Sequence, residues 1–122
     1  MAKTILTVDD SASMRQMIRL TLSGAGYEVT EANDGAQGLA TARTKAFDMV
    51  LTDLNMPGLD GVSMIKEIRK LRSYTGIPIV LLTTESDAEK KAQAKAAGAT
   101  GWITKPFQPE QLLSVTKKVL GQ

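Results

Sequence analysis

Five short apolar segments occur along the chain, and each is followed by a segment in which apolar residues recur at helical spacing. The apolar segments predict strands at residues 3–8, 27–32, 48–53, 77–82 and 100–104. The first, third and fourth contain runs of adjacent apolar residues, which are typical of strands buried on both faces of a parallel sheet. Because the other two are half polar, we expect them at the edges of that sheet.

The segments between the strands predict five helices. Ser11 or Ser13 is expected to cap the first, Asp34 the second and Asp60 the third. The residues expected to face the core are Met14, Met17, Ile18 and Leu22; Ala36, Leu39 and Ala40, with Phe47 after them; Met64, Ile65, Ile68 and Leu71; and Leu112, Val115 and Val119. The helix expected at about 87–97 offers only small residues, among them Ala88, Ala92, Ala96 and Ala97.

This alternation predicts an α/β fold with a parallel five-stranded sheet and helices on both faces, the flavodoxin-like (βα)5 arrangement. The order 2-1-3-4-5 places the two half-polar strands at the edges, and we expect its connections to be right-handed. The second, third and fourth helices then cover one face, and the first and fifth the other. The direction of winding reverses between strands one and three, where ligands bind in such folds.

The amino-acid composition limits the kinds of functional site that the chain can form. A length of 122 residues predicts one domain, 1–122. The chain has neither His nor Cys, which excludes an imidazole base, a thiolate nucleophile and a cysteine zinc site. The net charge of +2 is not the strongly basic balance of a nucleic-acid binder. The sequence has neither an apolar run long enough to span a membrane nor a secretory signal, so we expect a cytoplasmic protein without membrane partners. We also expect a monomer that does not bind nucleic acid.

Three aspartates follow two neighbouring strands. Asp9 and Asp10 come directly after the first strand, and Asp53 ends the third. Neighbouring strands lie about 4.8 Å apart, so these carboxylates should meet at one edge of the sheet. A proton or a cation must relieve their repulsion, and a site with only oxygen ligands suits Mg²⁺. The alternative is that Asp9 and Asp10 merely cap the first helix, but it leaves the third carboxylate unexplained.

Two further groups are predicted at the same edge. The hydroxyl of Thr83 follows the fourth strand, and Lys105 follows the fifth with a side chain long enough to reach back. A cation, an amine, a hydroxyl and backbone N–H groups around one carboxylate are typical of a phosphoryl-binding site. The carboxylate that they would surround is Asp53, which is therefore the candidate nucleophile.

Four motifs carry a resemblance to a known family. The segments Val8-Asp9-Asp10, Leu51–Pro57, Leu81–Thr84 and Lys105-Pro106-Phe107 resemble the receiver domain of two-component response regulators, most closely the stand-alone chemotaxis regulators of the CheY type. The motifs occur in the right order and the resemblance covers essentially the whole chain. Flavodoxin and CheY are themselves the standard examples of the strand order 2-1-3-4-5.

The resemblance implies a role for each matching position. Asp53 would accept a phosphoryl group from a histidine kinase. Asp10 would bind Mg²⁺ directly and Asp9 directly or through water, with Asp53 and the backbone carbonyl of Asn55 completing the protein ligands.

Further roles concern the phosphoryl group and its lifetime. Thr83, the N–H of Thr84 and Lys105 would contact the phosphoryl oxygens, and the Lys105–Pro106 bond would be cis. Asn55 and Glu85 would tune the access of water. Trp102 stands where the family usually has Tyr or Phe, and with Thr83 it would form the switch.

The implied protein is a signalling switch and not an enzyme, although it catalyses its own phosphorylation and dephosphorylation. No segment is left for an output domain, so we expect binding to a partner such as the flagellar motor switch, through the fourth helix, fifth strand and fifth helix. A phosphohydrolase of haloacid-dehalogenase type is the alternative, but it needs an acid where Asn55 stands. A receiver fold that is not phosphorylated is disfavoured by the complete set of site residues.

Overall fold

The computed structural model describes residues 2–84 and 88–121. Its sheet is built from β1 (Thr4–Val8), β2 (Glu28–Ala32), β3 (Met49–Asp53), β4 (Ile79–Thr83) and β5 (Gly101–Thr104). All neighbouring strands are parallel, in the order β2-β1-β3-β4-β5. The predicted fold and strand order are therefore confirmed, with the half-polar strands at the edges.

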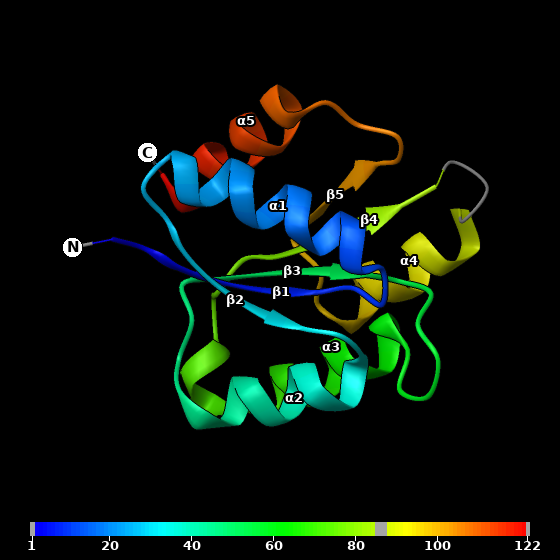
Figure 1. Cartoon of the computed structure of the whole chain (residues 1–122). Helices are drawn as coiled ribbons and strands as arrows, with labels where there is room; N and C mark the ends of the chain where they lie inside the picture. Colours follow the sequence, from blue (N-terminus) through cyan, green and yellow to red (C-terminus); the bar gives the residue numbers. More distant parts are fainter. Residues whose placement is uncertain (1, 85–87, 122) are drawn as a thin grey trace.

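Helices cover both faces of the sheet (Figure 1). They are α1 (Ala12–Gly24), α2 (Gly35–Thr44), α3 (Gly61–Arg69), α4 (Ala88–Ala97) and α5 (Pro109–Leu120), with a 3-10 turn, η1, at Arg72–Tyr74. One hydrophobic core lies between the sheet and α2, α3 and α4, and a second lies between the sheet and α1 and α5. This distribution follows the right-handed connections that the sequence predicted.

Side-chain caps fix where the helices begin. The side chains of Ser11, Asp34 and Asp60 accept hydrogen bonds from backbone N–H groups in the first turns of α1, α2 and α3. These three caps were predicted. The cap of α5 was not: Gln108 and Gln111 form a reciprocal capping box there.

The buried face of α2 differs from the prediction. Ala36 and Ala40 are exposed, whereas Leu39 and Ala42 are buried. The reason is Gly38, which faces the sheet: a Cβ at this position would lie 2.9 Å from a methyl carbon of Val8. A glycine that the sequence presented as a weakness of the helix is what lets α2 approach the sheet.

The predicted alanine face of α4 is only partly right. Ala97 packs half-buried against the core, but Ala88, Ala92 and Ala96 are exposed, and Ala94 is the buried residue of the helix. The C-terminal end of α4 is instead held by Arg69, whose Nε and Nη2 donate to the carbonyl of Gly98 at 3.0 and 2.7 Å. An alanine-rich helix has no amphipathic pattern from which its buried face can be found.

Tyr74 is a core residue that the sequence did not reveal. It is fully buried in η1. Its hydroxyl lies 3.0 Å from the carbonyl oxygen of Ala42 and 2.8 Å from that of Lys45, and accepts from the N–H of Phe47 at 3.3 Å. These contacts tie η1 to the end of α2, far from the strand ends that carry the acidic residues.

Candidate functional site

Asp9, Asp10 and Asp53 form an acidic cluster at the carboxyl edge of the sheet. One carboxylate oxygen from each lies within 4.8 Å of the others. The arrangement follows from the register, since Val8 pairs with Thr52 and the two strands end side by side. Asp9 and Asp53 are buried, whereas Asp10 is exposed. The predicted meeting of the three carboxylates is confirmed.

The surroundings of Asp9 fit a bound cation. Its Oδ1 accepts the N–H of Ser11 at 2.9 Å, but its buried Oδ2 has no hydrogen-bond partner among the described residues. Burial raises the pKa of Asp9 above its ordinary value, and the carboxylates of Asp53 and Asp10 add to this rise. The Ser11 N–H and Lys105 oppose it. A divalent cation would supply the missing partner of Oδ2 and stabilise the ionised form.

Lys105 reaches into the cluster from the far edge of the sheet, as predicted. Its Nζ lies 3.3 Å from Oδ1 of Asp53 and 3.8 Å from Oδ2 of Asp9. The Lys105–Pro106 bond is cis, as the resemblance implied. Oδ1 of Asp53 also accepts the N–H of Leu54 at 2.8 Å. The carboxylate of Asp53 is thus oriented by one amide and one ammonium group.

Thr83 ends β4 beside Asp53, because Asp53 pairs with Leu82 in the neighbouring strand. The side chain of Thr83 is buried. Its hydroxyl donates to the backbone carbonyl of Thr84 at 3.3 Å. Thr84 is exposed at the same edge. Glu85, predicted to tune water access, lies outside the described residues.

Two residues of the site were missed by sequence reasoning. Arg15 on α1 donates to the carbonyl of Asp9 at 2.6 Å and lies 3.4 Å from Glu31 on β2. Lys90 on α4 donates to Oδ1 of Asn55, which is exposed on the loop after β3. Basic residues on helices ordinarily face solvent, so no sequence signal distinguishes these two.

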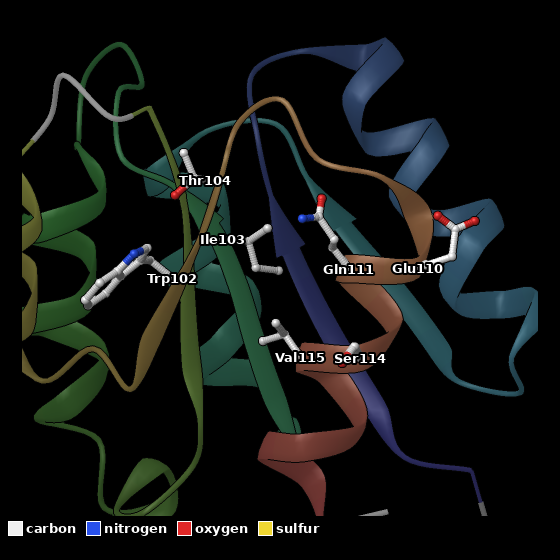
Figure 2. Close-up of a pocket in the computed structure, with 7 residues that line it drawn as sticks. All are labelled: Trp102, Ile103, Thr104, Glu110, Gln111, Ser114 and Val115. Carbon is white, nitrogen blue, oxygen red and sulfur yellow. The ribbon is translucent and has the colours of Figure 1, made fainter.

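The side chain of Trp102, on the edge strand β5, is 47% exposed. Figure 2 shows its indole on the opposite side of the strand from Ile103, which points toward α5. The ammonium of Lys91 lies 5.3 Å from the centre of the indole ring. A hollow of about 450 Å³ is lined by β5 and α5 residues: Trp102, Ile103, Thr104, Glu110, Gln111, Ser114 and Val115. No acidic-cluster residue lines it.

A sequence profile described as the response regulator receiver domain matches residues 5–117. The chain belongs to this family. Receiver domains are phosphoaccepting signalling switches that interact with histidine kinases and downstream targets, and they generally bind Mg²⁺. The fold prediction and the family resemblance are therefore both confirmed.

Solved and curated receiver proteins resemble this receiver domain over nearly its whole length. The structure of the chemotaxis regulator CheY4 of Vibrio cholerae matches with a TM-score of 0.93 and 47% identity, covering 98% of this chain and 99% of that one. The chemotaxis protein CheY1 of Helicobacter pylori is 39% identical over 122 residues, covering 96% of both chains.

Other relatives are longer. The phosphate regulon transcriptional regulatory protein PhoB of Pseudomonas aeruginosa is 38% identical, but the match covers 97% of this chain and only 52% of PhoB. The chain likewise spans about half of the DNA-binding response regulator MtrA of Mycobacterium tuberculosis, 49% of its length. Receiver domains thus occur both in DNA-binding regulators and in proteins of this length. In the two described ranges, the helices of this receiver domain are too short or too polar to cross a membrane.

Proposed function

We propose that this receiver domain, residues 1–122, accepts a phosphoryl group on Asp53 from a histidine kinase and then changes its binding to a partner protein. The observation that carries the proposal is that Asp53 lies 3.3 Å from the ammonium of Lys105 and within the acidic cluster of three carboxylates. An aspartate beside a cationic side chain and a candidate metal site is suited to phosphoryl transfer.

In the proposed transfer a carboxylate oxygen of Asp53 attacks phosphorus. The phosphorus–oxygen bond forms as the phosphorus–nitrogen bond to the kinase histidine breaks, and the electron pair of that bond stays on the imidazole. Asp9, Asp10, Asp53 and the backbone carbonyl of Asn55 would hold Mg²⁺. Bound there, the ion would supply positive charge to the phosphoryl oxygens.

The residues of the chain then divide the remaining work. The Nζ of Lys105 would bind one phosphoryl oxygen, while the hydroxyl of Thr83 and the N–H of Thr84 would bind another. Asn55 would limit the approach of water, together with Glu85. The attraction of Thr83 to the phosphoryl group would open space beside β4, and Trp102 would turn inward to fill it.

The proposed output surface consists of α4, β5 and α5. Five lysines frame it, Lys90, Lys91, Lys95, Lys117 and Lys118, which favours an acidic partner. We place the protein in chemotaxis, with the flagellar motor switch as the partner, because regulators of similar length named for chemotaxis match it end to end. A cytoplasmic location and a monomeric state are parts of the same proposal.

Incubation with acetyl phosphate and Mg²⁺ tests the proposal. Intact-protein mass spectrometry should show one phosphoryl group per chain, lost on acid or hydroxylamine treatment, and Asp53→Asn should abolish it. Asp60→Asn is the matched control, because Asp60 caps α3 outside the acidic cluster. An adduct on Ser11, Thr83 or Thr84 would refute the assignment, and steady turnover of unrelated phosphomonoesters would favour a phosphohydrolase, although Asn55 cannot act as its acid.

A further inference from the structure

Lys90 connects α4 to the phosphorylation site. It is the third residue of α4, and its ammonium donates to the side-chain oxygen of Asn55, 35 residues away along the chain. Asn55 follows Asp53 by two residues, so this hydrogen bond reaches the loop that leaves the phosphoacceptor. Ala94 is the buried residue of α4, so apolar packing holds this helix only weakly. The hydrogen bond from Lys90 to Asn55 can therefore influence where the first turns of α4 lie.

The charge of Lys90 is not neutralised in the described parts of the chain. No ion pair there involves Lys90, whereas Lys105 faces two carboxylates. Asp60 and Lys66 line the same hollow of about 200 Å³ between α3 and α4 as Lys90 does. The carboxylate of Asp60 accepts the N–H of Ser63 at 2.8 Å and serves as a helix cap. Among the described residues, the ammonium of Lys90 thus donates to a neutral amide oxygen, that of Asn55.

A phosphoryl group on Asp53 would change this balance. It brings about −1.5 to −2 charges at neutral pH. An ammonium group binds a charged phosphoryl oxygen more strongly than a neutral amide oxygen. Lys105 approaches Asp53 from the loop after β5, whereas Lys90 reaches Asn55 from the first turn of α4, so the two amines come from different parts of the chain.

We propose that Lys90 is a second cationic residue of the phosphorylation site, which rests on Asn55 in the unphosphorylated protein and binds the phosphoryl group once Asp53 carries it. This inference rests on the function proposed above. Its consequence is that the negative charge on Asp53 holds the first turns of α4 at the mouth of the site. The phosphoryl group would thus act on α4 directly, in addition to any path through Thr83.

Beryllofluoride, a phosphoryl mimic, provides the test. Its affinity for the Mg²⁺-loaded protein is measured by calorimetry or by ¹⁹F NMR for the wild type, Lys90→Met, Lys90→Arg and Lys66→Met. Lys66 is the matched control, since it is exposed, lines the same hollow and has no contact with Asn55 among those described. Lys90→Met should weaken binding by about twofold to fivefold, the range of an exposed ion pair, and Lys90→Arg should restore it.

Salt dependence separates a charge effect from a structural one. The affinity of the wild type should fall more steeply with ionic strength than that of Lys90→Met, and the two should converge at high salt. Equal affinities for Lys90→Met and Lys66→Met, with the wild type binding normally, would overturn the role of Lys90 alone. A wild type that binds no beryllofluoride in the presence of Mg²⁺ would instead refute the proposed function.

Discussion

The crowding of the acidic cluster predicts that Asp9→Asn stabilises the metal-free protein. At an effective dielectric constant of about 20, two unit charges 4.8 Å apart repel by about 3.5 kcal/mol. Asp9 faces two such charges, while its attraction to Lys105 at 3.8 Å offsets one of them by about 4.4 kcal/mol. Because Asp10 is exposed and its charge is screened, we expect a gain of about 1–2 kcal/mol in the free energy of unfolding.

Urea unfolding in EDTA at low ionic strength measures this gain. The asparagine oxygen can still accept the N–H of Ser11, so the substitution keeps the hydrogen bond that Asp9 makes. Asp34→Asn is the control, because Asp34 caps α2 and asparagine caps equally well. Asp53→Asn should stabilise less than Asp9→Asn, since it loses the shorter contact to Lys105, 3.3 Å. A destabilised Asp9→Asn protein in EDTA would refute the argument from charge crowding.

The pH dependence follows from the raised pKa of Asp9. As the pH rises through 3.8, the ordinary value of an aspartate, the unfolded chain loses this proton first. The folded metal-free protein still holds it, so its stability falls with rising pH until Asp9 ionises in the folded state as well. The advantage of Asp9→Asn should therefore be absent below 3.8 and complete above the folded-state pKa. An advantage that persists at the most acidic pH would contradict burial as its cause.

Four other measurements test the structure. Mg²⁺ at about one hundred times its dissociation constant should add about 2.7 kcal/mol to the unfolding free energy, and thermal melts indifferent to Mg²⁺ would exclude a metal site. Emission from Trp102, the one tryptophan, should change when Mg²⁺ and beryllofluoride are added together, and Thr83→Ala should suppress the change; an unresponsive spectrum would leave Trp102 as fixed packing. Gly38→Ala should destabilise by about 1–3 kcal/mol in urea unfolding, because its methyl group would lie 2.9 Å from neighbouring side chains, and a neutral result would show that α2 can move outward. Tyr74→Phe should cost about 1–3 kcal/mol by the same method, since it leaves the N–H of Phe47 without its side-chain acceptor, whereas an unchanged midpoint would mean that another acceptor replaces it.

The hydrophobic pattern separated the edge strands of the sheet from the central ones. Strands buried on both faces read as apolar runs and edge strands do not, so the pattern placed β2 and β5 at the edges and agreed with the order 2-1-3-4-5. Once the order is known, residues that follow adjacent parallel strands must share an edge. For this reason Asp9, Asp53 and Thr83 could be brought together from the sequence, and Lys105 could be added because its reach exceeds the spacing of the strands.

Tertiary structure alone decided the contacts made by side chains whose sequence pattern is neutral. The alanines of α4 have no apolar periodicity, so only packing selected Ala94 as the buried one. Gly38 is a poor helix former by propensity. Only the structure shows why a glycine suits this position: α2 packs closely against the methyl groups of Val8 and leaves no room for a Cβ. Arg15 and Lys90 look like solvated basic residues in the sequence. In the structure, Arg15 binds the backbone carbonyl of Asp9, and Lys90 binds the side-chain oxygen of Asn55, 35 residues away along the chain. Periodicity records which face of an element is buried, whereas the partner of a long polar side chain depends on how the completed elements are placed in space.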